Sequence, residues 1–108
     1  MLAAAWAGLL LWLGTRPGAG LPAALPGADK IAHVACYGVL GFLLARAIGT
    51  RAAWVWAGLA GVAWGALDEW LQASVPGRSS DLLDVLADAI GAFAGGWIAL
   101  RTAARALR

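Results

Sequence analysis

The sequence contains few charged residues for its length, and this shortage narrows what the chain can be. Only 13% of its 108 residues are charged, whereas 62% are hydrophobic. A typical soluble domain has about 25% charged and about 45–50% apolar residues. The composition therefore predicts a small integral membrane protein with a single domain.

Cysteine and basic charge are also scarce. Cys36 is the only cysteine, which excludes a disulfide framework and a cysteine-based metal site. Because it lies in an apolar run, we expect it to pack between helices. The net charge is only +2 and the sequence has no basic stripe. Nucleic acid is therefore not an expected partner.

Four apolar segments predict an all-α integral membrane protein, a bundle of about four transmembrane helices with short loops. The predicted spans are residues 2–14, 29–48, 52–73 and 80–100. A Gly- and Pro-rich stretch at 15–28 and the pair Pro76-Gly77 interrupt the apolar pattern. The first span is short, because it rises only about 20 Å against a hydrocarbon core of about 30 Å. Asp29 and Ser80 are the candidate N-caps of the second and fourth spans.

The basic residues predict an orientation. With four spans, one side of the membrane carries Arg46, Arg51, Arg101, Arg105 and Arg108. The other side carries Arg16, Lys30 and Arg78. The positive-inside rule then places both termini in the cytoplasm. We therefore expect a multi-pass protein of the cytoplasmic membrane.

Polar residues gather at one end of three predicted spans, at helical spacing. On the second span the set is Asp29, His33, Tyr37 and Gly41. On the third it is Gly58, Gly61, Gly65, Asp68 and Gln72, with Glu69 beside them. On the fourth it is Asp81, Asp84, Asp88, Gly91 and Gly95. Steps of three or four residues place each set on one helix face. A charge inside a span costs about 2.5–3.5 kcal/mol, so such residues usually face the bundle interior or water and mark function.

The glycine stripes on these faces predict close helix packing. Gly61-x-x-x-Gly65 and Gly91-x-x-x-Gly95 allow two helix backbones to approach each other in lipid. Packing within one chain is the favoured interpretation, with a dimer motif as the alternative.

The polar ends together predict a pocket at the extracytoplasmic face. Its candidate ligand-binding residues are Asp29, Lys30, His33, Tyr37, Asp68, Glu69, Gln72, Arg78, Asp81, Asp84 and Asp88. His33 is a base, a metal ligand or a hydrogen-bonding core residue. Lys30 and Arg78 either pair internally with the acids, or Arg78 contacts an anionic headgroup or phosphate.

Carboxylates in such a pocket raise the question of a metal. Asp68, Glu69, Asp84 and Asp88 offer the oxygen ligands that hard cations prefer. No established metal-ligand spacing accompanies them, so we expect no metal and no cofactor. Ser79 and Ser80 are expected to cap a helix rather than to act as nucleophiles, because no Gly-x-Ser-x-Gly elbow surrounds them.

Three motifs, taken in order, resemble the VanZ-like membrane proteins. They are Asp29-Lys30-x-x-His33-x-x-x-Tyr37, Asp68-Glu69-x-x-Gln72-x-x-x-Pro76-Gly77-Arg78-Ser79 and Asp81-x-x-Asp84-x-x-x-Asp88-x-x-Gly91. The resemblance implies a single VanZ-like transmembrane domain of about four helices in a bacterial membrane. It also suggests a biological context rather than a reaction, because the founding member of the family is linked to low-level resistance to the glycopeptide teicoplanin. The family commonly has Asn at the position of Asp88, where this chain adds a potential charge. The short first span is a second departure.

Two functions fit these observations. In the favoured one, the pocket binds membrane lipids and a lipid-linked cell-envelope intermediate or lipoglycopeptide, without catalysis. In the alternative, the protein is a membrane-embedded enzyme acting on a lipid or lipid-linked substrate. Its candidate catalytic residues are then His33, Asp68, Glu69 and Asp84, with Arg78 stabilising a phosphate or oxyanion. Ion passage is disfavoured, because the polar residues stop near one face.

Overall fold

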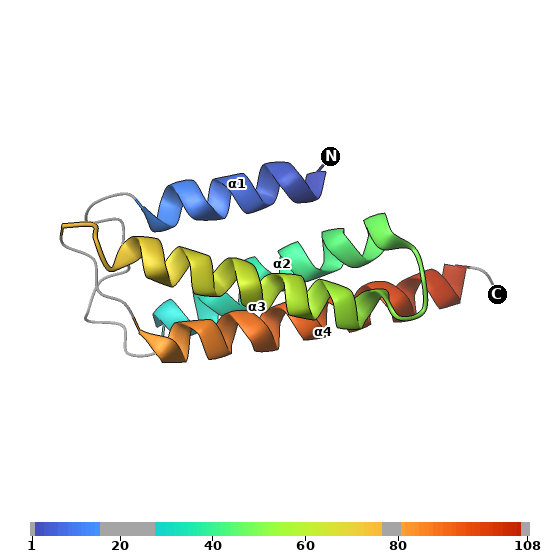
Figure 1. Ribbon diagram of the computed structural model, residues 1–108. Helices are drawn as coiled ribbons and strands as arrows, with labels where there is room; N and C mark the ends of the chain where they lie inside the picture. Colours follow the sequence, from blue (N-terminus) through green and yellow to red (C-terminus); the bar gives the residue numbers. More distant parts are fainter. Residues whose placement is uncertain (1, 16–27, 77–80, 107–108) are drawn as a thin grey trace.

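The chain folds into four helices. A computed structural model describes residues 2–15, 28–76 and 81–106 (Figure 1). Within these ranges it contains no strand, and its helices are α1 (Leu2–Gly14), α2 (Ala28–Ile48), α3 (Ala53–Gln72) and α4 (Leu82–Ala106). The prediction of an all-α chain with about four helices is confirmed for this part of the sequence.

The helix ends differ from the prediction at two places. Asp29 lies inside the first turn of α2, so its assignment as the N-cap is wrong; its carboxylate instead accepts a hydrogen bond from Lys30. The predicted cap Ser80 lies outside the described residues. Asp81 occupies the capping position of α4, where its Oδ1 accepts the N–H of Leu83 at 2.9 Å.

The fourth helix is longer than predicted. It continues to Ala106, beyond the expected end at residue 100. The added segment, Arg-Thr-Ala-Ala-Arg-Ala, contains mostly alanine and arginine, which are strong helix formers. The apolar run therefore ends near residue 100, but the helix continues.

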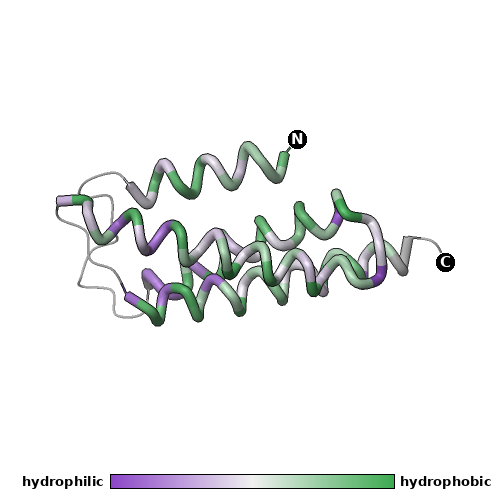
Figure 2. Tube along the Cα trace, in the orientation of Figure 1, coloured by the Kyte–Doolittle hydropathy of each residue, from purple (hydrophilic) through white to green (hydrophobic). Residues whose placement is uncertain are grey.

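The helices run alternately in opposite directions (Figure 1). The chain termini both lie at one end of the bundle, and the end of α3 and the starts of α2 and α4 lie at the other. Figure 2 shows that most hydrophilic residues gather at this second end, and that another hydrophilic spot marks the turn between α2 and α3. The up-and-down order therefore brings the three predicted polar segments together.

Glycines allow α2 and α4 to touch through their backbones. A Cβ atom at Gly95 would collide with the carbonyl group of Gly38, and one at Gly91 would collide with the carbonyl group of Val34. The glycine stripe of α4 thus packs against another helix of the same chain, as predicted. This close contact fixes the rotation and register of the two helices that carry most of the polar site.

The glycines of α3 face α4 in a similar way. A Cβ atom at Gly61 would collide with the side chain of Ala92. One at Gly65 would crowd the carboxylate of Asp88. The glycine at position 65 therefore makes room for a buried acidic side chain as well as for a helix.

Two indole groups tie α1 to the rest of the bundle. Trp6 Nε1 donates a hydrogen bond to the carbonyl of Cys36 in α2 at 2.8 Å. Trp64 Nε1 in α3 donates one to the carbonyl of Ala7 at 3.0 Å. Cys36 is partly buried and packs against the apolar cluster of Leu10, Tyr37 and Leu40, which confirms its predicted packing role.

In the part of the chain that the structure describes, two helices are long and apolar enough to cross a membrane. These are Asp29–Ile48 in α2 and Leu82–Ala103 in α4, judged by length and composition. The helix α1 is apolar but shorter.

Candidate functional site

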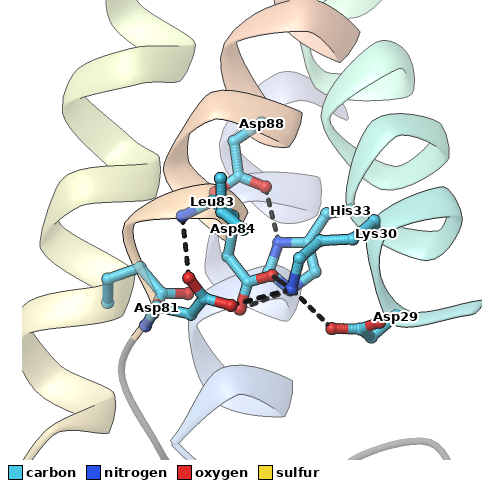
Figure 3. A network of polar contacts seen from close by, with 8 residues as sticks. Asp29, Lys30, His33, Asp81, Leu83, Asp84 and Asp88 are labelled. Carbon is cyan, nitrogen blue, oxygen red and sulfur yellow. Dashed lines mark hydrogen bonds and ion pairs between the residues drawn. The ribbon is translucent and has the colours of Figure 1, made fainter. Parts of the chain in front are cut away.

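The predicted polar residues converge at one end of the bundle (Figure 3). The first turns of α2 carry Asp29, Lys30 and His33, and the first turns of α4 carry Asp84 and Asp88 just after Asp81. The last turns of α3 carry Asp68, Glu69 and Gln72, all buried. Residues that are more than 30 positions apart in the sequence therefore form one site.

Lys30 is the centre of an ion-pair network. Its Nζ lies 2.7 Å from Asp29 Oδ2, 3.0 Å from Asp81 Oδ2 and 2.6 Å from Asp84 Oδ1 (Figure 3). An ammonium group has three donors, and here each carboxylate receives one. Of the two interpretations left open by the sequence, internal pairing holds for Lys30. The network joins the start of α2 to the start of α4.

His33 lies between two carboxylates of α4. Its Nδ1 is 2.6 Å from Oδ1 of Asp88, a completely buried residue. Its Nε2 is 3.8 Å from Oδ2 of Asp84. The ring stacks on Tyr37, with centroids 6.4 Å apart and planes within 4°. A carboxylate on one ring nitrogen fixes the orientation of the imidazole and leaves the other nitrogen for chemistry.

Glu69 places a carboxylate from α3 into the same region. Its Oε2 accepts the backbone N–H of Asp81 at 2.8 Å, and the side chain is only 4% exposed. Its Oε1 is buried and has no hydrogen-bond partner within the described part of the chain. The same is true of Asp88 Oδ2. Buried acceptors are rarely left unpaired, so these two oxygens point to a missing donor or cation.

Asp81, just before α4 begins, connects α2, α3 and α4. Its backbone N–H bonds Glu69, and its carboxylate bonds both the Leu83 N–H and the Lys30 ammonium group. The Leu83 N–H, followed by Lys30, holds the pKa of Asp81 below its ordinary value. Asp81 therefore stays charged where a free aspartate would begin to take up a proton.

The remaining predicted residues lie at the edge of this group or outside it. Asp68 lies against the end of α1, because a Cβ atom at Gly14 would collide with its carboxylate. Gln72 is buried one turn further along α3. Arg78, predicted to contact an anionic group, lies outside the described residues together with Ser79.

An apolar groove begins next to the polar site. It lies between α2 and α4, has a volume of about 380 Å³, and is lined by residues that include Val34, Gly38, Phe42, Gly91, Gly95 and Ile98. Val34 directly follows His33, and Gly91 lies about one helical turn after Asp88. The packing glycines therefore also form part of the floor of a surface groove that leads away from the carboxylates.

Among the described residues of the site, hydrogen-bond acceptors outnumber donors. Around one ammonium group and one imidazole lie the carboxyl groups of Asp29, Glu69, Asp81, Asp84 and Asp88. Such a site suits a ligand that donates hydrogen bonds or carries positive charge. His33 held by Asp88 also has the arrangement of a general base.

Three side chains are placed to share a metal ion. His33, Glu69 and Asp84 each offer one ligand atom, and these atoms lie within 4.8 Å of one another. From the sequence, His33 was one possible metal ligand, no bound metal was expected, and the possible oxygen ligands of a hard cation were Asp68, Glu69, Asp84 and Asp88. The signal that was available for His33 was its four-residue register with Asp29 and Tyr37, which put it on the site-facing side of its helix.

The match to a family model agrees with this arrangement of motifs. The model described as VanZ/LLP1 matches residues 3–104. No match was found among curated proteins or among solved structures. The matched range contains every residue of the polar site and nearly all of the four helices. The chain therefore belongs to the VanZ/LLP1 family, as its three motifs predicted.

Proposed function

We propose that this chain is a multi-pass protein of a bacterial membrane that binds the polar head of a lipid-linked cell-envelope component or lipoglycopeptide. The observation that carries this proposal is the pair of buried, unpartnered carboxylate oxygens on Glu69 and Asp88. They belong to the last turns of α3 and the first turns of α4, and the apolar groove includes Gly91, about one helical turn after Asp88. Membership of the VanZ/LLP1 family supports a link to glycopeptide resistance or envelope homeostasis.

The distribution of apolar side chains on α2, α3 and α4 supports insertion into a membrane. Ile31 is 72% exposed, Trp56 61% and Leu82 85%, while Asp88 is completely buried. Soluble monomers rarely expose large contiguous apolar patches, whereas lipid favours this arrangement. Both termini lie at the end opposite the site, so the basic residues of that end favour a cytoplasmic position for the termini. The site then faces the extracytoplasmic side.

The two parts of the site match the two parts of an amphiphile. Amine or hydroxyl groups of a polar head would donate hydrogen bonds to Glu69 Oε1 and Asp88 Oδ2. Its hydrocarbon chain would lie in the apolar groove between α2 and α4, against residues that include Val39, Phe42 and Ile98. Lipid-linked envelope intermediates and lipoglycopeptides both combine a donor-rich head with a long apolar chain.

A binding measurement tests this proposal. Protein in nanodiscs is exposed to a bacterial lipid extract or to teicoplanin, and the retained species are quantified by mass spectrometry. We expect Glu69→Gln to weaken retention at least tenfold, because it removes a charge-assisted acceptor worth about 1.5–3 kcal/mol. Arg51→Gln, in the exposed turn at the opposite end, is the matched control and retains the same species as wild type. Equal retention by wild type and Glu69→Gln contradicts the proposal.

A second candidate function is catalysis on the same class of ligand. It is favoured by the contact of 2.6 Å between His33 and Asp88, which leaves Nε2 as a base. The same lipid extracts distinguish the two functions. Conversion of a lipid species by wild type and not by His33→Gln supports an enzyme, whereas retention without conversion supports binding alone.

A further inference from the structure

We propose that His33, Glu69 and Asp84 form a binding site for one divalent transition-metal ion of the Mn²⁺ and Zn²⁺ class. The ion would occupy Glu69 Oε1, the oxygen that the proposed function gives to a ligand donor, so the two proposals are alternatives for that atom and are tested separately. Such a site departs from the expectation drawn from the sequence, where no metal was predicted. The three residues belong to three different helices, so no short sequence motif contains all of them.

The distances suit a shared ion. One ligand atom from each residue lies within 4.8 Å of the other two. Metal–ligand bonds of about 2.0–2.2 Å place neighbouring ligand atoms roughly 3–3.6 Å apart. Rotation of the side chains about their own torsions closes a difference of this size, and the helices need not move.

His33 is prepared as a ligand. Asp88 holds its Nδ1 at 2.6 Å, and Nε2 faces Asp84. Histidines that bind metals nearly always give their other ring nitrogen to a carboxylate or carbonyl, which fixes the ring and raises its basicity. Asp88 therefore acts as a positioning residue for this ligand.

The two carboxylates are prepared in the same manner. Glu69 uses Oε2 to accept the Asp81 N–H, and its buried Oε1 has no partner among the residues that the structure describes. Asp84 uses Oδ1 to accept from Lys30, and its Oδ2 lies 3.8 Å from His33 Nε2. Each of the three ligands thus has one polar atom held by another residue, while His33 Nε2 and Asp84 Oδ2 face each other at 3.8 Å, a gap that an ion would bridge.

Charge and donor chemistry select the class of ion. Among the described residues, one ammonium group, from Lys30, faces three carboxylates, and Glu69 and Asp88 add two buried ones; a dication would offset this surplus of acidic groups. Mg²⁺ and Ca²⁺ favour sites built from oxygen alone, whereas one imidazole nitrogen with two carboxylate oxygens suits Zn²⁺ and Mn²⁺.

Electron paramagnetic resonance of Mn²⁺ tests the proposal directly. Untagged full-length protein in nanodiscs, stripped with a chelator, is titrated with Mn²⁺ and then with competing Zn²⁺. We expect one Mn²⁺ per chain, displaced by Zn²⁺, and at least tenfold weaker binding in Glu69→Gln and Asp84→Asn. Arg51→Gln, in the exposed turn at the opposite end of the bundle, is the control; its affinity for Mn²⁺ stays within about threefold of wild type.

Pulsed measurements on wild type remove any dependence on the folding of variants. His33 is the only histidine of the chain. Bound Mn²⁺ should therefore show coupling to one imidazole nitrogen, and this coupling should be absent in His33→Gln. Absence of Mn²⁺ and Zn²⁺ binding overturns the proposal, and so does bound Mn²⁺ without nitrogen coupling. Undiminished affinity in both Glu69→Gln and Asp84→Asn also overturns it.

Discussion

Asp88 illustrates how single residues shape this site. Its carboxylate is completely buried, one oxygen contacts His33, and Gly65 supplies the space that it occupies. The side chain thus combines a partner for the imidazole ring with a shape that fits against Gly65.

Substitutions of Asp88 separate shape from charge. We expect Asp88→Asn to change the free energy of unfolding by less than about 1 kcal/mol, because the amide oxygen still accepts from His33. Asp88→Leu leaves the imidazole without that partner and should destabilise the protein by about 1–3 kcal/mol. Thermal unfolding of the two variants in the same detergent measures the difference. Equal losses in Tm would mean that the negative charge itself is required.

At the scale of elements, the pairing of α2 with α4 determines the geometry of the site. These helices meet through Gly38 and Gly95 and through Val34 and Gly91, with backbone against backbone. The contact sets which faces of the two helices look toward each other. Lys30 and His33 consequently meet the carboxylates of α4, and the apolar groove continues along the same seam.

Adding one methyl group to this seam should disturb it. Gly95→Ala would press a Cβ atom against the Gly38 carbonyl, and overpacking of this kind costs about 1–3 kcal/mol. Gly8→Ala in α1 is the control, because a Cβ atom there meets nothing within 4 Å. We expect a lower Tm for the first variant and an unchanged or higher Tm for the second. An unchanged Tm in Gly95→Ala would show that α2 and α4 can move apart without a loss of stability.

At the scale of the whole molecule, the up-and-down order separates two chemical ends. The polar site lies at one end, and both termini lie at the other, near the turn between α2 and α3. The proposed orientation in the membrane therefore exposes one set of turns to the outside and the other to the cytoplasm.

Cysteine labelling of intact cells measures this orientation. In a Cys36→Ser background, Ser74→Cys and Thr50→Cys place a thiol in exposed positions at opposite ends of α3. We expect a membrane-impermeant maleimide to label Ser74→Cys in intact cells, and Thr50→Cys only after permeabilisation. The reverse pattern would place the polar site in the cytoplasm and exclude an extracytoplasmic ligand.

Much of the fold could be read from local patterns in the sequence. The apolar runs bounded by Pro and Gly predicted all four helices, and steps of three or four residues predicted which faces are buried. Gly61, Gly65, Asp68 and Gln72 all lie buried on one face of α3, as their spacing indicated. These features depend on neighbours along the chain, so the sequence alone determines them.

The contacts of the site were decided by tertiary structure. The sequence predicted Asp29 as an N-cap, yet its carboxylate bonds Lys30. Asp81 caps α4 instead, and its backbone N–H donates to Glu69. The sequence also grouped four carboxylates as the candidate metal ligands, whereas the folded chain brings His33 to two of them. Which atoms meet across three helices depends on their rotation and register. Backbone contact at the glycines and the indole hydrogen bonds to helix carbonyls set both, and neither is encoded in any one helix by itself.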